Sequence, residues 1–263
     1  MSHLDSIVAL RRSDLAAEKR PGELERLQRA ALLRTDRRDF EAAVLSGRPA
    51  LIAEIKRASP SAGAIDGGCD AAATARAYEA GGAAALSVLT ESRHFAGSFA
   101  DLTRARAAVA LPVLCKDFIV DEFQIWKAVA RGADAVLLIA AVLCDRQLYS
   151  FVALSANLGV AALVEVHSSE EIARALAAGA SMFGINNRDL HSFAVDVATA
   201  VRLRSTIPLD CPVVGESGYR TRADVHAAAE AGLDAVLVGE ALMRAADRAA
   251  TLRALRGDVA WSG

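Results

Sequence analysis

The sequence has 263 residues, in which 30 Lys and Arg stand against 32 Asp and Glu for a formal net charge of −2 at pH 7. A chain of this length can bury a large core, either as one α/β barrel or as two small domains. Because the charge is nearly balanced, no basic field attracts nucleic acid or anionic lipid, and we expect neither as a partner.

The cysteines and the hydropathy pattern indicate the compartment. The four cysteines are widely spaced and include no CxxC pair, so we expect reduced thiols, no disulfides and no metal site. The longest apolar run, residues 135–144, is about half as long as a membrane span requires. Residues 1–5 lack the apolar core of a signal peptide. We therefore expect a soluble cytoplasmic protein without membrane contacts.

The N-terminal part of the chain is helical in pattern. Residues 4–45 are rich in Arg, Glu, Leu and Ala, and Pro21-Gly22 divides the run in two. This pattern predicts an N-terminal helical extension over residues 1–48 that packs on the rest of the protein. We interpret its charges as a solvent-exposed face.

After Pro49, short apolar runs alternate with Ala-rich amphipathic stretches of helical length. Some of these stretches open with a capping-box pattern, such as Ser168 to Glu171 and Thr221 to Asp224. The apolar runs lie near residues 51–56, 83–89, 112–115, 135–140, 160–166, 182–185, 212–214 and 235–238.

Eight strands alternating with helices predict the α/β class, as a single (β/α)8 TIM barrel over residues 49–263 with the N-terminal helical extension. No composition break separates two halves, so we expect one structural domain overall. The alternative is a doubly wound open sheet, which would usually carry a GxGxxG fingerprint after its first strand, and this chain has none.

Glu54 and Lys56 are unusual within the first predicted strand. Their two-residue spacing places both side chains on the same face of the strand. A carboxylate and an ammonium in an apolar interior cost free energy unless they serve each other or a ligand. Taken alone, the pair fits a structural ion pair on an edge strand equally well.

Further polar side chains follow the later predicted strands. They are Lys116, Glu165, Asn186 with Arg188, and Glu216. Catalytic residues of (β/α)8 barrels gather at the carboxyl ends of the strands. Packing alone does not account for charges or amides at the same end of five strands, so we interpret these residues as one functional site.

Two small turns indicate an anion site. Ser217-Gly218 and Gly239-Glu240 follow the last two predicted strands, expose backbone N–H groups and are expected to lead into helix N-termini. With Ser59 across the mouth of the barrel, they predict a phosphate pocket. The alternative is that these glycines only permit tight turns.

Several motifs, in order along nearly the whole chain, resemble those of the indole-3-glycerol phosphate synthase family of tryptophan biosynthesis. They are Ile52 to Ser61 (IAEIKRASPS), Ala83 to Glu91 (AAALSVLTE), Phe95 to Ser98 (FAGS), Pro112 to Phe118 (PVLCKDF), Ala162 to His167 (ALVEVH), Gly184 to Leu190 (GINNRDL), Val214 to Gly218 (VGESG) and Val238 to Met243 (VGEALM). Two mild departures are Cys115, where a basic residue is common, and Ala62, where Lys is frequent.

The resemblance implies a (β/α)8 barrel with an N-terminal extension and a lyase reaction. The reaction converts 1-(2-carboxyphenylamino)-1-deoxyribulose 5-phosphate to indole-3-glycerol phosphate, CO₂ and water, without cofactor or metal. The expected partner is thus a small anionic sugar phosphate. For the oligomeric state we expect a monomer or a weak homodimer, and since the chain ends soon after its last predicted helix, no fused second enzyme.

Residue types suggest roles in this reaction. Lys116, which the resemblance also implies, is the expected acid for the forming alkoxide. Lys56 with either Glu54 or Glu165 is the expected pair for dehydration, and the sequence does not decide between the two carboxylates. Glu165 also suits the orientation of Lys116.

The remaining assignments concern binding. Asn186 is expected to hydrogen-bond the sugar hydroxyls or the substrate carboxylate, with Arg188 as its helper or as a structural ion partner, and Glu216 is expected to hold Lys56. The groups expected to grip the phosphate are Ser59, Ser217, Gly218, Gly239 and, through its backbone, Glu240. Phe118 and Leu137 are expected to contact the aromatic ring, although a plain core role explains either equally well.

Three other functions fit parts of this pattern. A Schiff-base aldolase also places lysines at strand ends, and phosphoribosylanthranilate isomerase shares the barrel and phosphate site but lacks inward lysines on both strands. A barrel that only senses a sugar phosphate would gain nothing from buried acid–base pairs. Among the histidines, only His167, directly after a predicted strand, is placed to take part.

Overall fold

Eight parallel strands close into a barrel in the computed structural model, which describes residues 3–189 and 194–258. The strand order around the barrel is β1-β10-β9-β8-β7-β6-β5-β4, and β4 pairs with β1 to close it. Each strand overlaps one predicted apolar run, so the predicted TIM barrel is confirmed. The strands are β1 (Ala50–Ile55), β4 (Ala85–Leu89), β5 (Val113–Lys116), β6 (Ala135–Ile139), β7 (Ala161–Val166), β8 (Met182–Asn186), β9 (Val213–Glu216) and β10 (Ala235–Val238).

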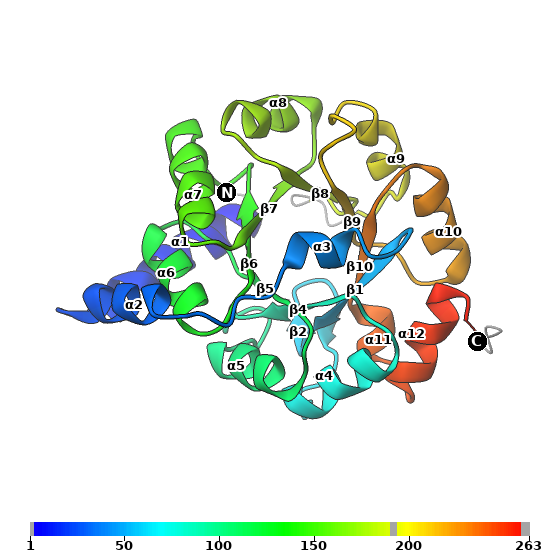
Figure 1. Ribbon diagram of the computed structural model, residues 1–263, viewed down its shortest axis with the longest axis horizontal. Helices are drawn as coiled ribbons and strands as arrows, with labels where there is room; N and C mark the ends of the chain where they lie inside the picture. The colour runs from blue at the N-terminus through cyan, green and yellow to red at the C-terminus, as the bar shows by residue number, and fades with distance from the viewer. Residues whose placement is uncertain (1–2, 190–193, 259–263) are drawn as a thin grey trace.

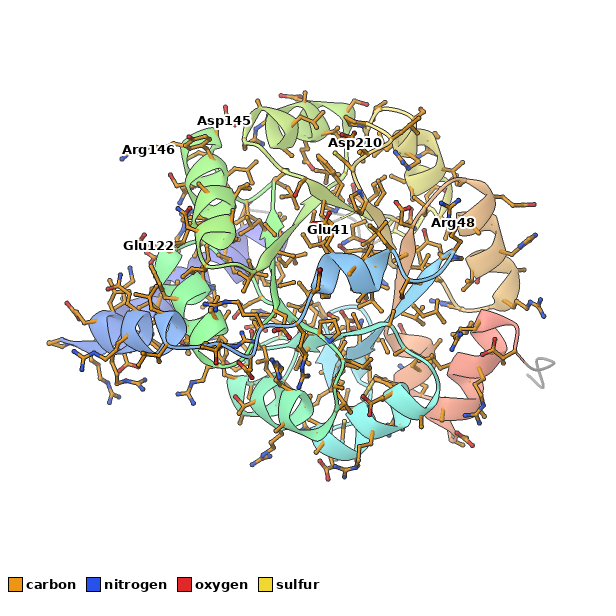
Figure 2. The ribbon with its side chains drawn as sticks, viewed as in Figure 1. Glu41, Arg48, Glu122, Asp145, Arg146 and Asp210 are labelled. Atoms are coloured by element: carbon orange, nitrogen blue, oxygen red, sulfur yellow. The ribbon has the colours of Figure 1, made fainter. Side chains whose placement is uncertain are left out.

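Helices between the strands form a ring around the barrel (Figure 1). They are α4 (Ala71–Ala80), α5 (Phe99–Ala108), α6 (Glu122–Ala130), α7 (Asp145–Asn157), α8 (Ser169–Ala177), α9 (Ala198–Arg204), α10 (Arg222–Glu230), α11 (Glu240–Met243) and α12 (Arg248–Arg256). Charged side chains such as Asp145 and Arg146 on α7 point away from the ring (Figure 2). In the described residues, no helix combines the length and the apolar character that crossing a membrane would take.

Two predicted helix starts differ in their capping. The hydroxyl of Thr221 accepts the backbone N–H of Asp224, whose carboxylate accepts the N–H of Thr221 in return, as a capping box requires. Ser168 likewise accepts the N–H of Glu171, but the Glu171 carboxylate accepts the backbone N–H of His167 at 2.7 Å. The carboxylate of Glu171 is thereby drawn toward the carboxyl end of β7.

Side chains of each strand alternate between the barrel interior and the surrounding helices. In β7, Leu163 belongs to the interior cluster, whereas Val164 and Val166 pack in the outer cluster with the helices. Glu165 therefore shares the inward parity of Leu163. Layers of aliphatic side chains fill the barrel below this level, so the polar side chains are confined to its carboxyl end.

The N-terminal extension consists of α1 (His3–Glu18), α2 (Glu23–Leu32) and α3 (Phe40–Val44). The predicted break is confirmed, because Gly22 adopts a left-handed φ of 77° between α1 and α2. The last helix, α3, lies across the barrel in Figure 1, and its Phe40 and Val44 join the interior cluster. The extension thus closes the amino end of the barrel.

We expected the charges of the extension to face solvent, but several of them are buried. The Arg11 side chain on α1 is 7% exposed and pairs with Asp117 after β5. Arg34, between α2 and α3, is 8% exposed and pairs with the fully buried side chain of Asp134. These ion pairs fix the extension to both ends of the barrel, which a helical charge pattern alone does not reveal.

Candidate active site

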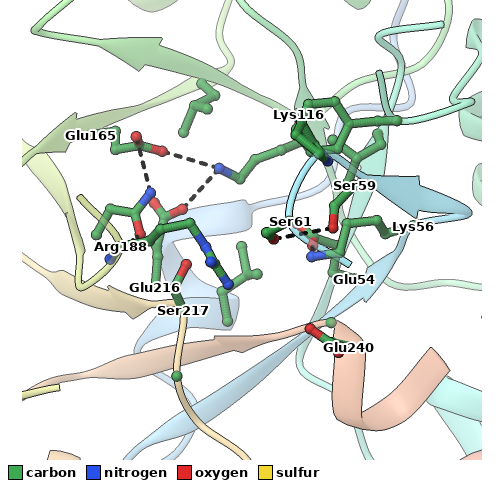
Figure 3. Close-up of a pocket in the computed structure, with 18 of the residues that line it drawn as sticks. Glu54, Lys56, Ser59, Ser61, Lys116, Glu165, Arg188, Glu216, Ser217 and Glu240 are labelled. Atoms are coloured by element: carbon green, nitrogen blue, oxygen red, sulfur yellow. Dashed lines mark hydrogen bonds and ion pairs between the residues drawn. The ribbon is translucent and has the colours of Figure 1, made fainter. Parts of the chain in front are cut away.

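A pocket opens at the carboxyl end of the barrel strands (Figure 3). It contains every residue that the sequence assigned to the site. These fourteen lining residues are Glu54, Lys56, Ser59, Lys116, Phe118, Leu137, Glu165, Asn186, Arg188, Glu216, Ser217, Gly218, Gly239 and Glu240. The prediction that charges at the strand ends converge on one pocket is confirmed.

Inward parity at the strand ends brings the charged groups together. Lys116, Asn186 and Glu216 are the last residues of β5, β8 and β9, and Glu165 is the penultimate residue of β7. Asn186 lies beside Glu216 in the strand register. A shift of one residue in any of these strands would turn its polar side chain to the other face of the sheet and out of the pocket.

Lys116 is the centre of the ionic network. Its Nζ lies 2.9 Å from Oε2 of Glu216 and 3.1 Å from Oε2 of Glu165 (Figure 3). Burial by itself lowers the pKa of Lys116, but the facing carboxylates, Glu216 first, outweigh it and raise the pKa above its ordinary value. Lys116 therefore holds its proton firmly in this arrangement of charges.

The two carboxylates around Lys116 differ in the direction in which their surroundings shift the pKa. Burial raises the pKa of Glu216 to about 7, and the neighbouring Glu165 and Glu54 add to the effect against the attraction of Lys116. Its Oε1 is buried and, within the described residues, has no hydrogen-bond partner. For Glu165, burial also opposes ionisation, but Lys116 and other donors prevail and lower its pKa.

Glu54 and Lys56 form a second ion pair in the same pocket. The Lys56 Nζ lies 2.7 Å from Oε1 of Glu54, whose Oε2 accepts the hydroxyl of Ser87 at 3.2 Å. A Cβ at Gly239 would lie 2.6 Å from Oε1 of Glu54, so this glycine leaves room for the pair. We expected Glu216 to hold Lys56; this was wrong, because Glu216 pairs with Lys116 and Glu54 holds Lys56.

Asn186 already makes two protein contacts. Its Nδ2 donates to Oε1 of Glu165 at 3.2 Å, and its Oδ1 accepts the backbone N–H of Arg188 at 3.0 Å. Asn186 thus orients Glu165 and the start of the loop that brings Arg188 into the pocket (Figure 3). The neighbouring Asn187, which the sequence did not single out, is buried and donates to the Ser217 carbonyl at 3.0 Å.

The two small turns differ in how they present N–H groups. Ser217 and Gly218 have φ of 65° and 91°, so two successive residues of this turn are left-handed. Both turns are followed by helices as expected, but the Ser217-Gly218 turn is not adjacent to its helix, because α10 begins only at Arg222. Gly239 leads directly into the short α11, where the Glu240 side chain pairs with Arg244.

Comparison with known proteins identifies the family. A sequence profile described as indole-3-glycerol phosphate synthase matches residues 4–255. An indole-3-glycerol phosphate synthase of Micrococcus luteus is 49% identical over 261 residues, which cover 97% of each chain. One of Kineococcus radiotolerans is 47% identical and covers 94% of this chain and 92% of its own. This chain belongs to the indole-3-glycerol phosphate synthase family.

Solved structures add only the fold. The 3-hexulose-6-phosphate synthase of Salmonella typhimurium superimposes with a TM-score of 0.63 at 16% identity, covering 79% of this chain and 97% of its own. At such low identity the likeness supports the barrel and not a shared reaction. The reaction of the indole-3-glycerol phosphate synthase family is a carboxy-lyase step in tryptophan biosynthesis.

The apolar side of the pocket includes residues that we did not predict. The ring of Phe95 lies 6.0 Å from that of Phe118, centroid to centroid, with the planes tilted by 40°. Leu4 and Ile7 of α1 line the same pocket. Phe95 stands in one of the motifs typical of the family, so this motif could have indicated its place in the site. The helical pattern of α1, in contrast, does not indicate that this helix lies over the mouth of the barrel.

The two departures from the family pattern lie away from the charged centre. Cys115 is buried among the outward-facing side chains of β5, so it has no access to the pocket. The backbone N–H of Ala62 donates to Oγ of Ser59 at 3.1 Å, and this contact needs no side chain at position 62. Neither departure alters Lys116 or its carboxylate partners.

His167 lies beside the charged centre. Its Nε2 is 3.6 Å from Oε1 of Glu165, and its Nδ1 is 3.4 Å from Oε2 of Glu171. Burial lowers the pKa of the imidazole, but the flanking carboxylates of Glu171 and Glu165 outweigh it and raise the pKa above its ordinary value. His167 therefore adds a pH-sensitive positive charge next to Glu165.

Proposed function

We propose that this chain converts 1-(2-carboxyphenylamino)-1-deoxyribulose 5-phosphate to indole-3-glycerol phosphate, CO₂ and water, with the fourteen pocket residues as its site. The observation that carries the proposal is the pair of ammonium groups, Lys116 and Lys56, that face one pocket, each held by a carboxylate. The small turns at Ser217-Gly218 and Gly239 border the same pocket and suit the phosphate.

The first step is ring closure. The ring carbon that bears the carboxylate attacks the ketone carbon, and the carbonyl electron pair moves onto oxygen. Lys116 donates its proton to this oxygen, so the alkoxide becomes a hydroxyl and the lysine becomes neutral. Glu165 and Glu216, both near 3 Å from Nζ, keep the ammonium aimed at the reacting oxygen. Since the pKa of Lys116 is raised, bound substrate must weaken this pairing before the proton moves.

Loss of CO₂ follows without a further proton donor. The electrons of the bond between the ring and the carboxylate return to the ring and restore its aromaticity. The apolar surroundings of Phe118, Phe95 and Leu137 favour this step, because leaving water disfavours the carboxylate and not the neutral CO₂. Phe118 and Leu137 thus serve both as packing and as the wall of the ring subsite.

Dehydration needs an acid for the departing hydroxyl and a base for the proton that leaves nitrogen or carbon. We assign these roles to Lys56 and Glu54, whose side chains lie 2.7 Å apart. Glu165 is the alternative base. Lys116 and Asn186 contact its two oxygens, as Lys56 and Ser87 contact those of Glu54, so the choice of Glu54 rests on its contact with Lys56. After water has left, proton transfer from Glu54 to Lys56 restores both groups. Lys116 takes up one proton from solvent, because loss of the carboxylate as CO₂ makes the whole reaction consume one proton.

The remaining residues bind substrate. We assign the phosphate to Ser59 and to the N–H groups of the Ser217-Gly218 and Gly239-Glu240 turns, with Arg188 as an additional cation. Asn186 orients Glu165 and in addition contacts the sugar hydroxyls.

One assay tests the proposal. Purified chain is mixed with the carboxyphenylamino sugar phosphate, and indole fluorescence is followed over time. Appearance of indole product, lost on Lys116→Ala, is expected. Absence of product from a folded chain would refute the proposal. Borohydride treatment during turnover tests the aldolase alternative, since the proposed route forms no imine and should leave the chain unmodified.

A further inference from the structure

Glu91 is a buried carboxylate just outside the pocket. It follows β4 by two residues and is 3% exposed. Its Oε1 accepts the backbone N–H of Arg93 at 2.9 Å, and its Oε2 accepts those of His94 at 2.7 Å and Phe95 at 3.1 Å. One side chain therefore satisfies three successive backbone donors.

The loop held in this way carries the ring of Phe95 into the pocket. The Phe95 ring faces that of Phe118, and its carbonyl accepts the backbone N–H of Ala58 at 3.2 Å. Past Phe95 the loop returns to Glu91, because the N–H of Gly97 donates to the Glu91 carbonyl at 2.8 Å. The position of Phe95 is thus fixed by Glu91 from both its side chain and its backbone.

Other contacts hold this loop less firmly. Arg93 pairs with Asp14 of α1, but its side chain is 52% exposed, and ion pairs this exposed add little stability. The Glu91 carboxylate, in contrast, is shielded from water, and hydrogen bonds to a charged acceptor are among the strong ones. Removing the charge leaves the three N–H groups to compete for water at the edge of the pocket.

Glu91 does not belong to the pocket lining itself, so it has no direct route to the reacting atoms. We infer that Glu91 is a positioning residue for the aryl end of the substrate, acting through Phe95. The inference rests on the proposed function, because it takes the Phe95–Phe118 side of the pocket as the ring subsite. Its effect is on binding of the ring and not on proton transfer.

Steady-state kinetics of Glu91→Gln test the inference. The amide keeps one acceptor but turns an NH₂ donor toward the backbone N–H groups, so the loop must move. We expect KM to rise about tenfold while kcat stays within about threefold, since a contact made equally in ground state and transition state affects KM alone. The matched control is Glu79→Gln. The Glu79 carboxylate also accepts a backbone N–H, that of Ala110 at 2.8 Å, but it lies outside the pocket.

A double-mutant cycle with Phe95→Ala separates positioning from general damage. If Glu91 acts through Phe95, Glu91→Gln should change KM by less than about twofold once Phe95 is alanine. Competitive inhibition gives a second readout: 2-aminobenzoate, which probes the ring subsite, should bind more weakly to Glu91→Gln, while inorganic phosphate should keep its inhibition constant within about twofold.

The inference is overturned by additive KM effects in the cycle, by an unchanged KM, or by equal weakening of both inhibitors. Should Glu91→Gln not fold, as judged by circular dichroism, Glu91→Asp is measured in the same way, since it keeps the charge and shortens the side chain by one methylene. Wild-type chain is assayed first. An inactive wild type refutes the proposed function, whereas an active wild type with the wrong variant pattern refutes only the role of Glu91.

Discussion

The guanidinium of Arg11 on α1 forms a bidentate ion pair with Asp117, the residue that directly follows Lys116. Arg11 Nε and one terminal nitrogen donate to the two Asp117 oxygens at 3.0 and 3.1 Å. Thr90 donates to the same carboxylate at 2.9 Å. The N-terminal extension is thereby joined, through buried charges, to the strand end that carries the proposed acid.

Arg11→Ala is expected to lower both stability and turnover. Loss of one partner leaves the buried Asp117 charge unpaired, which costs about 3 kcal/mol or more in comparable cases. A released strand end also lets Lys116 move, so kcat should fall along with the midpoint of urea unfolding. The neighbouring Arg12, which is exposed, supplies the control Arg12→Ala. Equal behaviour of the two variants in urea and in the assay would contradict the coupling.

Lys116→Ala and Glu165→Gln should each lower kcat by about 10²-fold or more, because each removes a group that handles or aims a proton. Substrate binding should change much less in either variant. The measurement is indole formation at saturating substrate, with binding followed by product inhibition. Turnover close to wild type in either variant would rule out its assigned role.

Strand parity explains why so much of the pocket could be predicted from sequence. Glu54 and Lys56 share a face because of their spacing, and Glu165 shares the inward parity of Leu163. Since all strands of the barrel run parallel, polar residues at their carboxyl ends must meet at one mouth. That argument needs only local pattern and the number of strands.

Partners within the mouth could not be predicted in the same way. The alternation of side chains along a strand predicts which polar groups point inward at the carboxyl end of the barrel. It does not predict how far each side chain reaches across the mouth. Four places separate β5 from β9 in the closed order of eight strands, so Lys116 must cross the mouth to reach Glu216. We expected Glu216 to hold Lys56, which directly follows the nearer strand β1. Phe95 escaped prediction for a related reason, because Glu91 places it through loop geometry and not through strand periodicity.

Gly184→Ala is expected to reduce activity by displacing Glu216. Gly184 faces the barrel interior in β8, and a Cβ built there collides with Oε1 of Glu216 and lies 3.5 Å from Leu163. The carboxylate must therefore shift away from Lys116, and we expect kcat to fall about tenfold, the size of one weakened charged hydrogen bond. Gly67→Ala is the matched control, since a Cβ at Gly67 has no neighbour within 4 Å. A Gly184→Ala enzyme as active as Gly67→Ala would show that the Glu216 carboxylate accommodates the added methyl group without losing its contact with Lys116.

His167 should make stability depend on pH in a direction that its surroundings determine. Its folded-state pKa is raised above the ordinary value of about 6.5, because Glu171 and Glu165 outweigh the cost of burial. A raised pKa means that the folded protein binds this proton more tightly than the unfolded chain does. The stabilisation is then complete below about pH 6.5 and is lost as the pH rises through the folded-state pKa.

The comparison of wild type with His167→Asn measures this contribution. The wild-type advantage in free energy of unfolding should be larger at pH 5.5 than at pH 9, and an NMR titration of the imidazole should give a pKa above 6.5 that falls in Glu171→Gln. His226→Asn is the control, because His226 faces Glu230 at 3.4 Å on α10 but its side chain is 72% exposed, so solvent screens the pair. An advantage that stays constant or grows with pH would mean that the carboxylates do not hold His167 protonated, and that Glu165 relies on Lys116 and Asn186 alone.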